Sequence, residues 1–306
     1  MNRKIIIAGG TGFIGRFLSK HFVEQGDEVI VFTRSNRLDS EGVQYVKWDG
    51  ESLGYWSSFL EDTDVLINMN GRSVDCRYNE QNKQEIYASR IQSTFILGEA
   101  IKKLKNPPKL WVNSSSATIY RHSEDLQMGE ENGELGKGFS VDVVKKWEKV
   151  FFESDILPVR KVALRTAIVL GRNGGALRPL INLSKIGFGG RQGNGRQFFS
   201  WIHEQDMIDA IEFIIENISV EGVVNIAAPI PEKNRVVMQT IRKKLKMPIG
   251  ICMPKYLLEI GARIIKTETE LILKSRNVVP HKLEQLGFQF KYHSIDAALE
   301  NLIRSK

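Results

Sequence analysis

The stretch Lys4-Ile5-Ile6-Ile7-Ala8-Gly9-Gly10-Thr11-Gly12-Phe13-Ile14-Gly15 decides the fold of this chain. It reads as a short apolar strand, a glycine turn and the start of a helix. Its glycines fit GxxGxxG or GxGxxG, two spellings of a dinucleotide-binding motif. Such glycines permit a tight turn and bring the backbone close to a pyrophosphate, which the N-H groups of the following helix can bind. We therefore predict cofactor contacts from Gly9, Gly10, Thr11, Gly12, Phe13, Ile14 and Gly15.

A glycine pattern alone is weak evidence, because glycine turns also occur where nothing binds. Here the surrounding sequence agrees with the motif. A β-branched strand precedes the turn, a helical apolar pattern follows it, and a second apolar strand covers residues 28–33. The agreement favours a binding turn over an incidental one.

The first half of the chain alternates between predicted strands and helices. Strands are predicted at 4–8, 28–33, 45–48, 65–69, 110–114 and 159–164, and helices at 13–25, 82–105 and 141–154. This alternation indicates an α/β fold, a Rossmann doubly wound parallel sheet. Residues 1–170 are predicted to form the dinucleotide-binding domain, rejoined by a helix and a strand within 205–230.

The remaining sequence predicts a smaller, mostly helical substrate-capping domain, made of residues 171–204 and 231–306. Its first part contains a loop at 171–175 and a glycine-rich run at 187–197, and such glycines let a backbone wrap a ligand closely. Beyond residue 231 we expect helices only, at 232–245, 255–265, 268–275, 281–286 and 295–304.

Composition excludes several classes of protein. The 306 residues are 42% hydrophobic and 26% charged, which is typical of a globular protein. No apolar run reaches the roughly 20 residues that cross a bilayer, and we expect no signal peptide. Two cysteines cannot build a disulfide framework, so we expect a cytoplasmic protein.

His203 has no histidine at metal-binding spacing, and we predict no metal site. The net charge of +7 is spread along the chain, which favours solvated helix faces over nucleic-acid binding.

The end of the second strand predicts which nicotinamide cofactor binds. NAD-binding sites usually carry an acidic residue there for the ribose 2′-hydroxyl, whereas arginine accommodates a 2′-phosphate. This chain has Thr33-Arg34-Ser35 at that end, with Arg37 just beyond. Guanidinium pairs with phosphate through two parallel hydrogen bonds. We therefore predict NADP(H), with Arg34 as the main 2′-phosphate ligand and Thr33 and Arg37 beside it.

Three hydroxyls close the fifth strand, in Asn113-Ser114-Ser115-Ser116-Ala117-Thr118-Ile119-Tyr120. At the carboxyl edge of a parallel sheet they would face the ligand crevice. With the glycine turn and Arg165, this run resembles the extended short-chain dehydrogenase/reductases, the sugar-nucleotide epimerase and dehydratase group.

A narrower resemblance covers essentially the full chain. Asn68-Met69-Asn70-Gly71, Lys83-Gln84-Glu85-Ile86, Ser89-Arg90, the run 164–170, the run 193–203 and Arg276-Asn277-Val278-Val279-Pro280 resemble an atypical branch labelled "epimerase family protein". Proteins of that branch end in a small domain of unknown function. Further cofactor contacts are expected at Asp49, Asn68, Asn70, Gly71, Ser114 and Arg165.

The sequence departs from the parent group at the residues that carry its chemistry. Active members place YxxxK on the helix after the fifth strand, where tyrosine transfers a proton and lysine lowers its pKa. None of the seven tyrosines here is followed by lysine four residues later. With Trp147-Glu148 as anchor, the two positions fall at about Ser140 and Val144.

Two interpretations follow from this departure. In the first, other groups perform the reaction: Ser116 corresponds to the serine that polarises substrate in epimerases, Tyr120 is the nearest phenol, and Arg90 stabilises an oxyanion or binds a substrate anion. The chain is then an NADP(H)-dependent oxidoreductase or epimerase-like enzyme, a possible homodimer, acting on a small polar molecule. In the second, the chain is an NADP(H)-binding sensor or regulatory protein without turnover.

Overall fold

The computed structural model describes residues 2–156, 158–264 and 268–304 of the chain. Its centre is a seven-stranded sheet in the order β11-β6-β5-β4-β1-β2-β3, in which every neighbouring pair is parallel. The order reverses between β1 and β4, which opens a crevice at the carboxyl ends of these strands. The strands of this sheet are β1 (Lys4–Ala8), β2 (Glu28–Thr33), β3 (Val43–Lys47), β4 (Val65–Asn68), β5 (Leu110–Ser116), β6 (Arg160–Thr166) and β11 (Gly222–Ile226).

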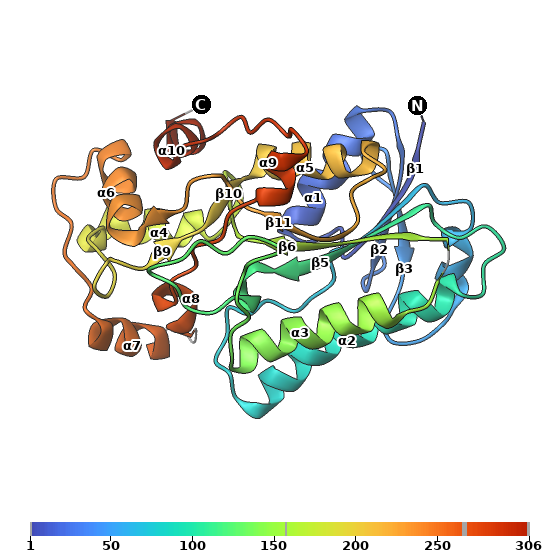
Figure 1. Cartoon of the computed structure of the whole chain (residues 1–306), viewed down its shortest axis with the longest axis horizontal. Helices are drawn as coiled ribbons and strands as arrows, with labels where there is room; N and C mark the ends of the chain where they lie inside the picture. Colours follow the sequence, from blue (N-terminus) through green and yellow to red (C-terminus); the bar gives the residue numbers. More distant parts are fainter. Residues whose placement is uncertain (1, 157, 265–267, 305–306) are drawn as a thin grey trace.

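Helices cover both faces of the sheet, with α1 and α5 on one face and α2 and α3 on the other (Figure 1). The helices are α1 (Phe13–Glu24), α2 (Glu80–Ile101), α3 (Phe139–Glu153), α4 (Leu177–Leu183), α5 (Glu204–Glu216), α6 (Asn234–Lys244), α7 (Lys255–Ile264), α8 (Glu270–Leu273), α9 (His281–Gln285) and α10 (Ile295–Arg304). Two 3-10 turns cover Tyr55–Leu60 and Ala117–Ile119, and a π turn covers Ser184–Phe188.

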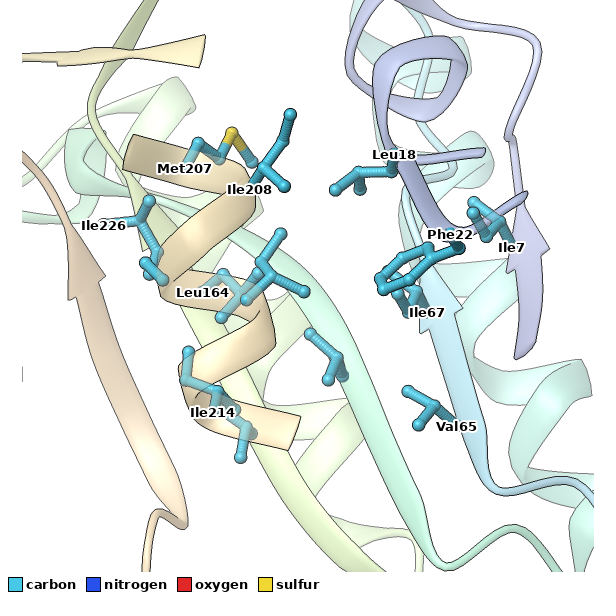
Figure 2. Packing of buried hydrophobic residues seen from close by; sticks show 14 of the residues in the cluster. Ile7, Leu18, Phe22, Val65, Ile67, Leu164, Met207, Ile208, Ile214 and Ile226 are labelled. Atoms are coloured by element: carbon cyan, nitrogen blue, oxygen red, sulfur yellow. The ribbon is translucent and has the colours of Figure 1, made fainter. Parts of the chain in front are cut away.

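The central strands are largely apolar because both faces of the sheet are buried. Alternate side chains divide between two cores: Ile5 and Ile7 face α1 and α5, whereas Ile6 and Ala8 face α2 and α3. Figure 2 shows the first core, where Leu18 and Phe22 of α1 lie beside side chains from β1 and β4. The two cores hold the sheet between its helix layers and so support the strand ends that border the crevice.

A second module lies beside the sheet, where α4, α6 and α10 pack around a separate apolar cluster (Figure 1). Two small sheets join it to the rest of the chain. The first has the order β10-β7-β8 and the second pairs β12 with β9. Their strands are β7 (Ile168–Gly171), β8 (Gly174–Gly175), β9 (Phe198–Phe199), β10 (Trp201–His203) and β12 (Glu232–Lys233).

The predicted fold class is confirmed, and the elements at 4–8, 28–33 and 295–304 have the predicted bounds. The expectation of helices only beyond residue 231 is wrong, because β12 pairs with β9 in antiparallel register. The predicted loop at 171–175 likewise contains β8. Two-residue strands have no periodicity to detect, and only pairing partners far along the chain define them. In the predicted helix at 255–265, position 265 lies outside the described residues.

The carboxyl-terminal tail returns from the second module to the sheet. Its segment 275–279 lies between β9 and the loop that follows β5: Ser123 N donates to Ser275 O (3.2 Å), and Arg276 N donates to Phe198 O (2.9 Å). Beyond it, Leu283 of α9 joins the core shared by α1 and α5. The division of the chain into a dinucleotide-binding domain (1–170 with 205–230) and a capping domain (171–204 with 231–306) stays a prediction.

His203 gives the fold a pH dependence that can be measured. Its ring stacks on Tyr292 at 3.8 Å between centroids, and burial lowers its pKa to about 4. Because the folded pKa lies below the unfolded value of about 6.5, only the unfolded chain takes up a proton between these pH values. Stability should therefore be lost as pH falls from 6.5 towards 4, by about 3 kcal/mol in total.

Urea unfolding at pH 7.5 and pH 5 measures this loss. In a His203→Gln variant the contribution should be absent, whereas His293→Gln, at an exposed position, should keep it. An equal pH dependence in the wild type and in His203→Gln would contradict the assignment.

Candidate functional site

The glycine turn between β1 and α1 leaves no room for side chains. Gly9 has a φ of +79°, a conformation that other residues rarely adopt, and a Cβ there would lie 2.8 Å from Oδ1 of Asn70. A Cβ on Gly15 would lie 2.4 Å from the Cα of Gly10. The start of the helix therefore packs directly on the turn, as the motif predicts for a backbone that approaches a ligand.

The N-terminus of α1 suits an anion. Gly12 occupies the N-cap position, and within the described part of the chain no side chain caps the helix and no acid lies in its first turn. The first N-H groups of a helix lack intrahelical acceptors and carry the positive end of the helix dipole. These groups, at Phe13 and Ile14, point towards the crevice end of β1 without a carboxylate to repel phosphate.

A cleft of about 470 Å³ extends from the end of β2 to the middle of α2. Arg34, Asp49, Asn70 and Gly71 are among its lining residues. Asp49 is engaged locally, since its Oδ1 accepts hydrogen bonds from the N-H groups of Glu51 (2.9 Å) and Ser52 (3.0 Å), and the side-chain hydrogen bond from Ser52 lowers its pKa. Arg34 is exposed, so its guanidinium is available to a ligand in this cleft.

A second, smaller cavity of about 210 Å³ adjoins the cleft, and the two share Asn70 and Gly71 as lining residues. Its wall combines the hydroxyls at the end of β5 with side chains of α2, α3 and the loop before α2. The lining residues are Met69, Asn70, Gly71, Val74, Tyr78, Ile86, Arg90, Ser114, Ser115, Ser116, Thr118, Phe139, Ser140, Val143, Val144 and Trp147. Among these described residues, Arg90 is the one charged side chain, so the cavity carries a positive charge.

Arg90 is half-buried, and no carboxylate of the described residues pairs with it. Its Nη1 donates to Ile86 O (3.2 Å), its Nη2 donates to Arg72 O (3.0 Å), and its guanidinium lies 5.4 Å from the ring centroid of Trp147. Burial lowers the pKa of Arg90 to about 10, so it remains charged near neutral pH. Across the residues that the structure describes, it forms no ion pair, although its surroundings are dry enough to lower its pKa.

Arg165 and Tyr120 belong to a buried network behind the cavity. Arg165 donates to both carboxylate oxygens of Glu148 (2.9 and 2.8 Å) and to the Tyr120 hydroxyl (2.9 Å). Tyr120 in turn donates to Oδ1 of Asn225 (2.9 Å), and Ser115 Oγ donates to Oε1 of Glu148 (2.6 Å). Burial alone would lower the pKa of Arg165, but Glu148 raises it overall. The network ties β5, β6 and β11 to α3.

Several other predicted cofactor residues are held by structural contacts. Asn68 is buried, and its Nδ2 donates to Oδ1 of Asn113 (2.7 Å). Phe13 packs against the β7–β8 turn, where a Cβ on Gly174 would lie 2.4 Å from its ring. The Arg37 guanidinium lies 5.8 Å from the Tyr45 ring centroid. The predicted residues outside the linings of the two cavities are Gly9, Gly10, Thr11, Gly12, Phe13, Ile14, Gly15, Thr33, Arg37, Asn68, Tyr120 and Arg165.

The sequence did not single out Tyr78 or Phe139. It named Trp147 only as an anchor on the helix, and Ser140 only as the expected tyrosine position. Tyr78 lies in the loop between β4 and α2, at the carboxyl edge of the sheet, where functional groups gather. The available signal was a tyrosine in the segment between a predicted strand and a predicted helix. Ser140 and Val144, the positions expected for the YxxxK pair, both line the small cavity.

Two classes of feature are absent from residues 2–156, 158–264 and 268–304. They hold no group of three or more histidine, cysteine or acidic residues arranged for a metal ion. They also include no helix with the length and apolar character needed to span a membrane.

Known proteins resemble the whole chain. Epimerase family protein MW0731 of Staphylococcus aureus is 32% identical over 303 residues, which are 99% of each protein. Epimerase family protein SERP0438 of Staphylococcus epidermidis is 30% identical over 99% of this chain and 100% of its own. The family model described as NAD dependent epimerase/dehydratase matches residues 5–137. This chain belongs to that epimerase family. Residues 253–302 match a domain of unknown function, DUF1731.

Solved structures agree with this family membership. The human epimerase family protein SDR39U1, crystallised with NADPH, has a TM-score of 0.86 and 28% identity, with 99% of this chain and 100% of the human chain covered. A nucleoside-diphosphate sugar epimerase from Corynebacterium glutamicum has a TM-score of 0.80 and 26% identity, with 99% of this chain but 58% of the other covered. The epimerase fold therefore extends through the second module as well as the sheet.

Proposed function

We propose that this epimerase-family chain is an NADP(H)-dependent oxidoreductase or epimerase-like enzyme that acts on a small polar substrate. The observation that carries the proposal is the continuity of the two cavities through Asn70 and Gly71. One cavity holds an exposed arginine at the end of β2, and the other holds hydroxyls at the end of β5. The presence of NADPH in the human relative supports the same class of cofactor here.

The residues present fit a dinucleotide. The bare turn at Gly9 and Gly10 and the uncapped start of α1 would hold the pyrophosphate. Arg34 would pair with the 2′-phosphate, with Thr33 and Arg37 beside it. Asp49, Asn68, Asn70, Gly71 and Ser114 lie along the remaining strand ends. When bound, the reduced nicotinamide supplies a hydride.

The small cavity is where we place the substrate. The Ser116 hydroxyl accepts a hydrogen bond from Thr118 N (3.2 Å), which leaves its own proton available to polarise a carbonyl. Arg90 would stabilise negative charge that develops on the substrate oxygen. For Tyr120 and Arg165 we propose a positioning role, since their contacts hold Glu148, and through it Ser115, in place.

A comparison of NADPH and NADH by calorimetry tests the cofactor, and a screen of small carbonyl compounds followed by NADPH absorbance tests turnover. We expect NADPH to bind more tightly and to raise the unfolding temperature with concentration. A preference for NADH, or no binding of either, would overturn the proposal. Binding without turnover of any compound would favour the sensor alternative. A homodimer and a cytoplasmic location remain predictions.

A further inference from the structure

The small cavity is bordered by a phenol, that of Tyr78, which belongs neither to the glycine turn nor to a strand end. Tyr78 borders it from the loop before α2, and its ring packs on Phe139 of α3 at 4.9 Å between centroids. The backbone is held as well, since Tyr78 N donates to Oε1 of Glu268 (2.8 Å). The ring is therefore fixed beside the cavity from two sides.

The hydroxyl of Tyr78 is buried, and it has no well-formed hydrogen bond within the described residues. Ser140 is close to it, but the Ser140 hydroxyl donates to Oε2 of Glu270 (3.3 Å). A buried polar group without a partner costs free energy, and such groups in native proteins often mark a site that a ligand completes. A substrate oxygen in the cavity would satisfy the phenol.

Two positively charged side chains lie near this phenol. The guanidinium groups of Arg90 and Arg276 both interact electrostatically with Tyr78. The other titratable neighbours are Glu268 and Glu270 from the tail and Cys76 from the same loop. Burial raises the pKa of the Tyr78 phenol, with Ser140 offsetting this in part, so the group is protonated near pH 7 and able to donate. Arg90 would stabilise the phenolate that donation leaves.

Tyr78 and Arg90 lie at the cavity where the missing YxxxK pair is expected. A tyrosine and a lysine are expected at Ser140 and Val144, and both positions border the same cavity as Tyr78 and Arg90. The small side chain of Ser140 lies close to the Tyr78 hydroxyl. Because Val144 is uncharged, Arg90 is the cation among the described lining residues. The loop before α2 and helix α2 therefore supply a phenol and a cation at a cavity where α3 supplies neither.

We propose that Tyr78 is the catalytic proton donor of this site, with Arg90 stabilising its phenolate. The proposal rests on the proposed function. The Tyr78 O-H bond breaks and its proton passes to the substrate carbonyl oxygen, as the carbonyl carbon takes up a hydride from the reduced nicotinamide. The product is an alcohol, and water returns a proton to the phenolate.

Carbon-13 NMR of protein labelled at tyrosine Cζ tests this directly. A Tyr78→Phe variant identifies the Tyr78 resonance among the seven tyrosines and retains the packing on Phe139. We expect saturating NADP⁺, whose nicotinamide is positively charged, to lower the pKa of Tyr78 by about 1 to 3. An Arg90→Met variant should raise it by a similar amount, and Arg90→Lys should restore it.

Tyr87 of α2 is the matched control. It lines a different groove, on the surface, and its ring contacts Lys146. Its pKa should not respond to NADP⁺. Calorimetry on the same samples shows whether the cofactor binds, and so tests cofactor binding separately from the role of Tyr78. If NADP⁺ binds and the pKa of Tyr78 is unchanged, the assignment of Tyr78 is overturned and the cofactor proposal stands. If NADP⁺ does not bind, both are overturned.

Discussion

Replacing Arg34 with glutamate is expected to weaken NADPH binding by about 100-fold while leaving NADH binding nearly unchanged. Hydrogen bonds to charged groups contribute roughly 1.5–3 kcal/mol, and each 1.4 kcal/mol is a factor of ten in affinity. The glutamate also repels the 2′-phosphate, which NADH lacks. Calorimetric titration of both cofactors against the wild type and the variant measures the change.

An Arg178→Glu variant is the matched control for this change. It makes the same alteration in net charge on an exposed position of α4, in the second module. It should leave both affinities within about twofold, since exposed charges beyond about 10 Å are screened at 0.1 M salt. An unaltered preference for NADPH in Arg34→Glu would remove Arg34 from the 2′-phosphate site.

Replacing Glu148 with methionine is expected to destabilise the protein by about 3–5 kcal/mol. The substitution keeps much of the side-chain volume but leaves the Arg165 guanidinium buried without its counter-ion. The Ser115 hydroxyl loses its acceptor in the same step. Urea unfolding at pH 7.5 measures the loss as a lower transition midpoint.

Two further variants show whether the unpaired charge is the cause. A double variant, Glu148→Met with Arg165→Met, removes both charges and should recover much of the stability. Glu134→Ala breaks the exposed ion pair with Arg121 and should cost less than about 1 kcal/mol. A double variant no more stable than Glu148→Met alone would mean that packing, rather than the unpaired charge, sets the loss.

The sheet could be predicted from the sequence because its signals are local. Strands such as β1 and β2 are continuous apolar runs bounded by glycine or charge, and the turn at Gly9 requires a residue without a side chain. Helix α2 begins two residues earlier than predicted, because Asn79 caps it by accepting from Asn82 N (2.8 Å). Its apolar pattern begins later than its hydrogen bonds do.

The site was less predictable, because its members are brought together by tertiary packing. Ser116 and Arg90 could be named from strand ends and from resemblance, and the structure places both on the small cavity. Tyr120 has the expected strand-end position, yet its hydroxyl contacts Arg165 and Asn225 on the buried side. Tyr78 reaches the cavity through a loop of irregular conformation, whose path no periodicity describes.

The tail that runs back from the second module to the sheet has a consequence for how this family can vary. The segment matched as a domain of unknown function, residues 253–302, includes Ser275, which is bonded to the loop after β5, and Leu283, which lies in the core of the sheet. This segment is therefore not a structurally independent domain. Exchange of this segment between relatives should succeed only when the loop at 120–128 is exchanged with it, so the two must change together during evolution.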